Sequence, residues 1–410
     1  SSRARLVEYF VALACYGFQM LRERPLKVPF GKAPIVNDLD RLTDHSSLLP
    51  QDELVPWLEA ASKFVLNTDF DISEELDGSP LPLSKLMKIM KDESAGKRTI
   101  QAIGDKILLN ALIENIGVPQ MPALYASHGD INESQVEQLV DDLESSLEDD
   151  AFDIVCKPTH LSNCTGTLLI TTDYWEYQEY DADTLVDHMK EYMPEKAHET
   201  ESAALQSLLP GFIIQPLYRS PYSSVPIEIR VFTLWGKTRV GVWWWGTGKE
   251  ENAWIVQGSR GEWRALHDNP KSTDEYKRSL GLILQQMPQM ARDAEKIAIA
   301  VGTPFLRSDF FVGSEKWGTR LNEVAYGSNI EMRRAAPGPS KSEDDSDAMA
   351  QILQEGYKHC RRQHPEMFLS RLGASGSSYE TEWWKFWSKA PGLQVSPTRK
   401  AQHFRFPTAC

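Results

Sequence analysis

The sequence FLRSDFFVGSEKWGTRLNEVA, residues 305–325, carries the pattern on which the interpretation of the whole chain depends. Segments 306–312 and 319–324 have the composition of strands and flank a glycine-containing turn. Alternate residues of a strand share one face, so an acid from each strand can approach a common point. Asp309 and Glu323 are placed to meet in this way.

Two acids that meet on a strand pair are suited to a divalent cation, because Mg²⁺ prefers a few carboxylate oxygens together with phosphate oxygens. Arg307 lies two residues before Asp309, would share its face and could meet negative charge beside the metal. The alternative is an exposed hairpin in which Asp309 or Glu323 forms a salt bridge with Arg307 or Arg320.

A second candidate group follows the apolar segment 152–156. Lys157 ends this predicted strand and precedes Pro158 and the small, polar loop 159–166. A lysine beside such a loop is well placed to meet a phosphate, over which backbone N–H groups of the loop can close. The alternative is a solvated lysine, and the same alternative applies to Lys106 at the start of a predicted helix.

Several short motifs follow one another along the chain. In order they are Asp105-Lys106, Gly117-Val118-Pro119, Lys157-Pro158, Gly166, Ile213-Ile214-Gln215-Pro216-Leu217, Arg307-Ser308-Asp309 and Glu323. This order resembles the ATP-grasp superfamily, in particular the D-alanine:D-alanine ligases and the bacterial teichuronopeptide-synthesis type. The resemblance covers residues 98–335 and rests on the ordered set, since none of the motifs is decisive alone.

The resemblance implies an ATP-grasp fold of the α+β class, in which two α+β lobes hold ATP and Mg²⁺ between them. It implies a ligase that activates a small-molecule carboxylate as an acyl phosphate and joins it to an amine. The implied divisions of the chain are a helical N-terminal region at 1–97, a first lobe at 98–210, a second lobe at 211–335, and a linker, helix and tail at 336–410.

The resemblance also assigns roles around the nucleotide. Lys106 and Lys157 would meet the phosphates, and the backbone of segment 215–217 would read the adenine edge as a hinge. His160, in the loop, either touches the nucleotide or is solvated. The full set expected to contact the nucleotide is Lys106, Lys157, His160, Gly166, Gln215, Pro216, Leu217, Tyr218 and Glu228.

The catalytic and metal-binding roles fall on the second implied lobe. Asp309 and Glu323 would hold Mg²⁺, while Arg307 would stabilise the charge that develops at the reacting centre. Arg230 would lie near the phosphates on a strand that faces the cleft.

Two positions depart from the family pattern. Relatives commonly carry E-x-N in the last strand, but Ala325 occupies the Asn position here. A further metal ligand is therefore missing or is supplied by Asn322 or Asn329. The loop after Lys157 holds only Gly166 where relatives often have several glycines. These departures leave two alternatives to the ligase: a kinase that phosphorylates a hydroxyl, and a nucleotide-binding scaffold without turnover.

Composition limits the other possibilities. Lys and Arg total 44 against 58 Asp and Glu, which gives a net charge of -14 and disfavours general nucleic-acid binding. The five cysteines form no C-x-x-C pair and predict reduced thiols in an intracellular, cytoplasmic setting. No apolar run approaches a membrane span, so no membrane partner is expected, although a removed targeting segment is not excluded.

Familiar nucleotide and hydrolase signatures are absent. The sequence GTGKE at 246–250 lacks the first glycine of a Walker loop and has Glu after the Lys, and no G-x-G-x-x-G, H-E-x-x-H or G-x-S-x-G occurs. Trp243-Trp244-Trp245 is better explained by alternating burial in a strand than by a ligand. The Trp-rich tail around 383–387 is interpreted as a possible docking surface for a protein partner.

The remaining elements are predicted from periodicity and turn residues. Helices are expected at 3–21, 53–65, 83–90, 105–116, 133–150, from a capping box at 272–275 to 300, and at 348–362. Strands are expected at 123–126, 152–156, 167–171, 212–217, 228–234 and 238–245. The acidic stretch 337–347 is interpreted as a linker or mobile loop.

Overall fold

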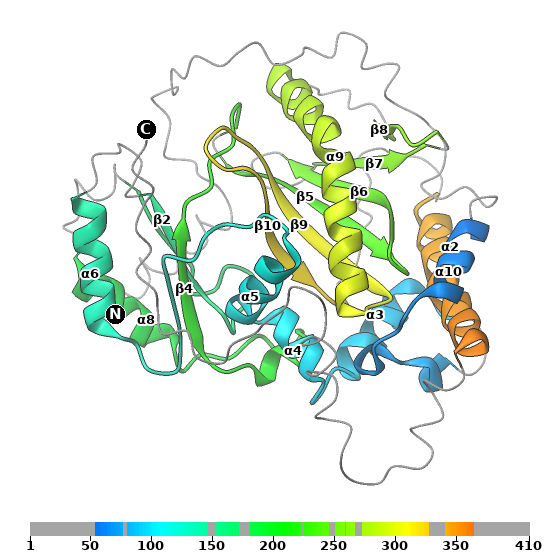
Figure 1. Ribbon diagram of the computed structural model, residues 1–410, viewed down its shortest axis with the longest axis horizontal. Helices are drawn as coiled ribbons and strands as arrows, with labels where there is room; N and C mark the ends of the chain where they lie inside the picture. The colour runs from blue at the N-terminus through cyan, green and yellow to red at the C-terminus, as the bar shows by residue number, and fades with distance from the viewer. Residues whose placement is uncertain are drawn as a thin grey trace. The chain divides into compact units, whose positions relative to one another are not determined.

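The computed structural model of the chain describes residues 54–76, 80–145, 153–171, 181–223, 225–245, 251–258, 260–266, 273–327 and 341–364. They form two antiparallel sheets, one of four strands and one of six, with helices against both (Figure 1). This combination confirms the predicted α+β class. Among the described residues, no helix is long and apolar enough to cross a membrane.

The four-stranded sheet has the order β1-β4-β2-β3, and each neighbouring pair is antiparallel. Its strands are β1 (Tyr125–His128), β2 (Ile154–Pro158), β3 (Leu168–Ile170) and β4 (Gly211–Pro216). Helices α6 (Glu133–Glu144) and α8 (Ala182–Tyr192) share a core with this sheet. The sequence analysis expects the second lobe to begin at residue 211. Because β4 pairs with β1 and β2, a division at that point would separate β4 from the sheet to which it belongs.

The six-stranded sheet has the order β10-β9-β5-β6-β7-β8. Its strands are β5 (Ile227–Leu234), β6 (Lys237–Trp245), β7 (Glu251–Gln257), β8 (Trp263–Ala265), β9 (Phe305–Ser314) and β10 (Gly318–Ala325). Figure 1 shows α9 (Asp274–Val301) running across one face of this sheet. On that face Trp243 stacks on Tyr276 of α9 with ring centroids 5.2 Å apart, which explains the burial of this tryptophan.

Helix α9 is 28 residues long and has defined ends. The sequence predicts a capping box from Ser272, but the N-cap is Thr273, whose side chain accepts a hydrogen bond from the backbone N–H of Tyr276 at 3.1 Å. The helix ends at Gly302, which has φ of 73° and so adopts the left-handed conformation that glycine tolerates best.

A helical group packs on the turn between β5 and β6. It consists of α2 (Leu54–Lys63), α3 (Leu83–Asp92), α10 (Lys341–Gln363) and the short 3-10 helices η3 (Thr68–Phe70) and η4 (Ser73–Leu76). Trp235, in the turn, donates from its indole nitrogen to the Ile352 carbonyl at 3.1 Å and meets Tyr357 edge to face. Gly356 makes this approach possible, because a Cβ there would lie 2.0 Å from the same indole nitrogen.

Another helical segment precedes β1 and leads to a link that contacts the six-stranded sheet. It contains α4 (Arg98–Gly104) and α5 (Lys106–Ile116), and the 3-10 helix η5 (Leu205–Ser207) lies later in the chain. After α5, the Pro119 carbonyl accepts a hydrogen bond from Leu321 N–H at 2.8 Å, and Gln120 forms a parallel bridge with Leu321. The link between α5 and β1 is therefore attached to the outer edge of the six-stranded sheet.

Some elements differ from the sequence predictions. Strands β7 and β8 and helix α8 were not predicted, and β1 lies two residues later than expected. Helix α10 begins at Lys341, so its first residues occupy part of the stretch interpreted as a linker. The predicted helix at 3–21 and the Trp-rich tail lie outside the described residues.

Candidate active site

The two predicted acids are direct cross-strand neighbours. Glu323 of β10 pairs with Asp309 of β9, and Asp309 pairs with Arg230 of β5, so the three side chains form one row across three strands. This row lies on the face opposite α9, because side chains alternate along each strand and Ile229, next to Arg230, pairs with Trp243, which stacks on Tyr276 of α9. The predicted convergence of Asp309 and Glu323 follows from this register.

Arg307 joins the two acids. Its guanidinium donates to both carboxylate oxygens of Asp309, at 2.8 and 2.7 Å, and to Glu323 Oε1 at 2.8 Å. Asp309 is almost wholly buried, whereas the side chain of Glu323 is 42% exposed. Arg230 lies farther off, with Nε 3.9 Å from Asp309 Oδ2. The ion pair weighed as an alternative at the sequence level is thus present, although the hairpin is not an exposed one.

Burial and charge act differently on the two acids. Burial raises the pKa of Asp309, Arg307 opposes this effect, and the net result lies above the usual value of an aspartate. Burial also raises the pKa of Glu323, but Arg307 and Lys106 lower it by more, so the net result lies below the usual value. The site therefore moves the pKa values of the two acids in opposite directions, upwards for Asp309 and downwards for Glu323.

A β-bulge places Asn322 beside these acids. The register between β9 and β10 shifts between Leu321 and Glu323, which gives β10 one extra residue there. As a result Asn322 and Glu323, although adjacent, both reach the same site. Asn322 donates to Glu228 Oε1 at 2.7 Å and accepts from Lys157 Nζ at 3.1 Å.

Lys157 connects the two sheets. It comes from β2, and its ammonium donates to Gln215 Oε1 on β4 at 3.2 Å as well as to Asn322 on β10. The ammonium also lies over the ring of Phe311, 5.9 Å from the centroid. Burial, with a smaller contribution from Lys106, lowers the pKa of Lys157 to about 8. The predicted alternative of a merely solvated lysine is wrong for this residue.

Lys106 supports the same region from helix α5. Its ammonium donates to the carbonyls of Pro158 and Leu161, at 2.9 and 3.0 Å, and burial lowers its pKa. Asp105 caps the helix and also meets His128 Nε2 at 2.7 Å, which fixes the start of α5. The sequence analysis did not predict the Asp105–His128 pair or the contact between Lys157 and the ring of Phe311. No sequence pattern indicates either contact.

The loop after Lys157 is tightly packed. Gly166 has φ of 67°, and a Cβ there would lie 2.8 Å from both Pro158 and Tyr192, so packing requires glycine. His160 is 3% exposed, its Nδ1 accepts from Gly211 N–H at 3.3 Å, and burial lowers its pKa. The expectation that His160 is solvated unless it touches nucleotide is therefore wrong. The structure shows no nucleotide role for Gly166 or His160, which stays a prediction.

The predicted hinge lies at the end of β4. Gln215 and Pro216 pair with β2, and Leu217 N–H donates to the Asp153 carbonyl at 2.7 Å. The Tyr218 hydroxyl donates to the Gly318 carbonyl at 2.5 Å and accepts from Ser314 N–H at 2.9 Å. Tyr218 thus ties the exit of β4 to the β9–β10 turn, and its predicted contact with ribose remains a prediction.

These residues contain a plausible set of metal ligands. Within the described ranges there is no group of three His, Cys, Asp or Glu side chains placed to hold a metal. Mg²⁺ needs fewer, because it is usually held by one or two carboxylates together with waters and substrate phosphates. Asp309 and Glu323 supply such a pair, with the Asn322 amide alongside. Asn329 lies outside the described residues.

Comparisons with known proteins were made by sequence and by structure. No family model matches the chain, and no curated protein does. Among solved structures, similarity is found to D-alanine–D-alanine ligase from Bacillus anthracis complexed with ATP, with 12% identity, a TM-score of 0.36, and coverage of 67% of this chain and 69% of that chain.

Two further similar structures come from other enzymes. The ATP-grasp ligase PsnB complexed with minimal precursor, Mg and ADP has 12% identity, a TM-score of 0.34, and coverage of 66% of this chain and 67% of that chain. D-cycloserine synthetase DcsG has 14% identity, a TM-score of 0.36, and coverage of 77% and 98%. With TM-scores below 0.5, the activity of this chain has to be argued from its own residues.

Proposed function

We propose that the chain is an ATP- and Mg²⁺-dependent ligase of the ATP-grasp type, which activates a carboxylate by phosphorylation and joins it to an amine. The observation that carries the proposal is the hydrogen bond from Lys157 of one sheet to Asn322 of the other, where Asn322 adjoins the row of Glu323, Asp309 and Arg230. Lys157, Asp309 and Glu323 also belong to the ordered sequence motifs that resemble ATP-grasp proteins.

The charge of the cluster supports a phosphate ligand. Four cationic groups, Lys106, Lys157, Arg230 and Arg307, lie around three carboxylates, Glu228, Asp309 and Glu323. Burial lowers the pKa of both lysines, which means that each charge lacks sufficient compensation without a ligand. Phosphate oxygens would supply that compensation. Lys106 and Lys157 are accordingly assigned to the nucleotide phosphates.

The acids and Arg307 are assigned to the reacting centre. Asp309 and Glu323 would hold Mg²⁺, which when bound neutralises charge on the phosphates. Arg307 already touches both acids, so it would stand beside the metal and stabilise the transferred phosphoryl group. Arg230, in the same row, would orient the carboxylate or a phosphate oxygen.

The proposed reaction has two steps. A carboxylate oxygen attacks the γ-phosphorus of ATP, the bond to the β,γ-bridging oxygen breaks, and ADP leaves. The amine nitrogen then attacks the acyl carbon, phosphate leaves, and the amine proton passes to solvent. Positioning and charge neutralisation dominate such phosphoryl transfers, so a covalent protein intermediate is not required.

The test begins with binding. ATP with Mg²⁺ should raise the melting temperature, because a ligand bound only by the folded state stabilises it. Lys157→Ala should remove the shift, and the exposed Lys196→Ala should not. No shift with the wild-type protein at millimolar nucleotide, together with a null calorimetric titration, contradicts the proposal.

A second experiment separates a ligase from the alternatives. The protein is incubated with ATP, Mg²⁺, a metabolite extract and hydroxylamine, and mass spectrometry follows ADP and new adducts. Hydroxylamine captures an acyl phosphate as a hydroxamate, whereas a kinase product is a stable phosphate ester. The absence of turnover despite ATP binding would favour the scaffold, which the Ala325 substitution in the E-x-N pattern also favours.

A further inference from the structure

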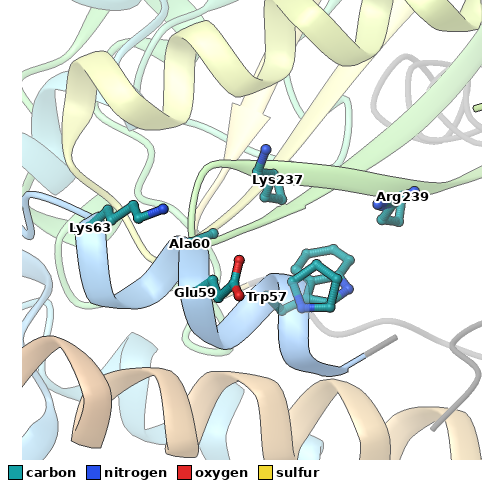
Figure 2. Close-up of a pocket in the computed structure, with 7 residues that line it drawn as sticks. Trp57, Glu59, Ala60, Lys63, Lys237 and Arg239 are labelled. Atoms are coloured by element: carbon teal, nitrogen blue, oxygen red, sulfur yellow. The ribbon is translucent and has the colours of Figure 1, made fainter. Parts of the chain in front are cut away.

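A cavity separate from the candidate active site lies between helix α2 and strand β6 (Figure 2). It has a volume of about 240 Å³. The lining residues are Pro56, Trp57, Glu59, Ala60, Lys63, Lys237 and Arg239. Figure 2 shows Glu59 and Lys63 reaching from α2 towards the strand that carries Lys237 and Arg239. None of these residues belongs to the nucleotide or metal set assigned above.

The lining is basic in a chain that is acidic overall. Three cationic side chains, Lys63, Lys237 and Arg239, face one carboxylate, Glu59, although the net charge of the chain is -14. In the portion of the chain that the structure describes, neither Lys63 nor Lys237 forms an ion pair. Uncompensated cations around a concave surface attract anions, because the field is focused there.

The backbone presents Arg239 to the cavity in a specific way. The β5–β6 register shifts between Phe232 and Thr233, which pair with Val240 and Thr238, so Arg239 is the extra residue of a β-bulge. Bulges commonly re-aim a side chain. Arg239 NH1 then donates to Gln257 at 3.1 Å, which orients the planar guanidinium for binding two oxygens of one anion.

Both walls of the cavity are anchored. Trp57 is 1% exposed and fixes α2 on one side. On the other side, Thr238 N–H donates to Glu295 Oε1 of α9 at 2.8 Å, next to Arg239 in the chain. The cavity is therefore formed by packed elements, with the ends of the exposed lysines at its rim.

We propose that this cavity binds a small organic dianion, either a phosphate monoester or a dicarboxylate. An excess of cations over the single carboxylate suits two negative charges, and Glu59 would accept a hydrogen bond from a hydroxyl or amine of the same molecule. The volume is smaller than that of sites for drug-sized ligands, so the ligand is a small metabolite. Trp57 and Ala60 provide the apolar wall for its carbon skeleton.

The test is calorimetric titration of the full chain with glycerol 3-phosphate, succinate and, as a monoanion, acetate. At least one dianion should bind more tightly than acetate. Lys237→Glu should weaken that binding about tenfold or more, because a charge-assisted contact becomes repulsive. Lys277→Glu on α9 is the matched control, since it makes the same charge change at another exposed lysine and should have no effect.

Two more variants test where the dianion binds. Lys63→Glu should reproduce the effect of Lys237→Glu if the latter variant does not fold, as judged by its melting curve. Lys157→Met, in the candidate active site, should leave dianion binding intact. Loss in Lys157→Met with retention in Lys237→Glu would place the dianion in the nucleotide site and overturn the proposal. No dianion binding at millimolar concentrations, or equal losses in Lys237→Glu and Lys277→Glu, would also overturn it.

Discussion

The partly buried charge of Lys157 should make the stability of the protein depend on pH in a way that its replacement by methionine abolishes. The pKa of Lys157 falls from 10.5 to about 8 on folding. Each pKa unit corresponds to about 1.4 kcal/mol, so carrying this charge costs the folded state about 3 kcal/mol at pH 7. The neutral amine can donate the hydrogen bonds to Gln215 and Asn322 as well as the ammonium can, so these bonds stabilise the folded state by about 1 kcal/mol each whatever the charge.

Lys157→Met removes both the cost and the two hydrogen bonds. The variant should therefore be more stable than the wild type by about 1 kcal/mol at pH 7. Because the folded pKa is the lower one, the unfolded chain binds more protons between pH 8 and 10.5. Wild-type stability relative to the variant then rises with pH through this window. By pH 10 the order should be reversed, with the wild type more stable.

The assay is urea unfolding of both proteins at pH 7 and pH 10, with Lys196→Met as the control because that side chain is exposed. The difference in unfolding free energy between wild type and Lys157→Met should change sign between the two pH values, and the control difference should stay near zero. If Lys157→Met is less stable than the wild type by the same amount at both pH values, the lysine is not a buried, uncompensated charge.

Three further predictions concern the same region. At pH 8.5, binding of ATP with Mg²⁺ should take up more protons, or release fewer, in the wild type than in Lys157→Met, because phosphates raise the pKa of Lys157 while any proton release from Asp309 on binding Mg²⁺ is common to both proteins. Calorimetry in buffers of different ionisation enthalpy measures this difference. Arg307→Ala should lower the unfolding free energy by about 3 kcal/mol or more, because Asp309 loses its bidentate partner, and Mg²⁺ alone should restore part of the loss in thermal melts. If Mg²⁺ does not change the melting temperature of Arg307→Ala, the assignment of Asp309 and Glu323 to the metal is contradicted. Gly166→Ala should cost about 2 kcal/mol or more, whereas Gly96→Ala, at a similar φ but with open space around it, should cost about 1 kcal/mol in the same assay.

The convergence of Asp309, Glu323 and Arg307 could be predicted from strand alternation and one short turn, because the two register shifts in this strand pair cancel and leave Glu323 opposite Asp309. Both are local properties, and the register of a hairpin fixes which side chains are neighbours. The helix start at Asp105 was predictable for the same reason, whereas β2 ends two residues later and β4 one residue earlier than predicted.

Contacts between the two sheets could not be predicted in this way. Lys157 and Asn322 are 165 residues apart, and their hydrogen bond depends on a bulge that composition does not reveal. The burial of His160 was likewise invisible, since the residue sits in a polar loop and is covered by chain segments remote in sequence. Strands β7 and β8 were missed because residues 251–265 show only weak alternation of apolar and polar side chains.

The bulge at Asn322 has a consequence for comparing this chain with others. Because β10 carries one extra residue between Leu321 and Glu323, its positions before and after that point are offset by one relative to an unbulged strand. An alignment without gaps across β10 can match either Glu323 or Asn322 to its spatial equivalent, but not both. A one-residue gap at this point keeps Glu323 aligned. The Asn322 amide can then be compared with amides of unbulged strands by its position in space.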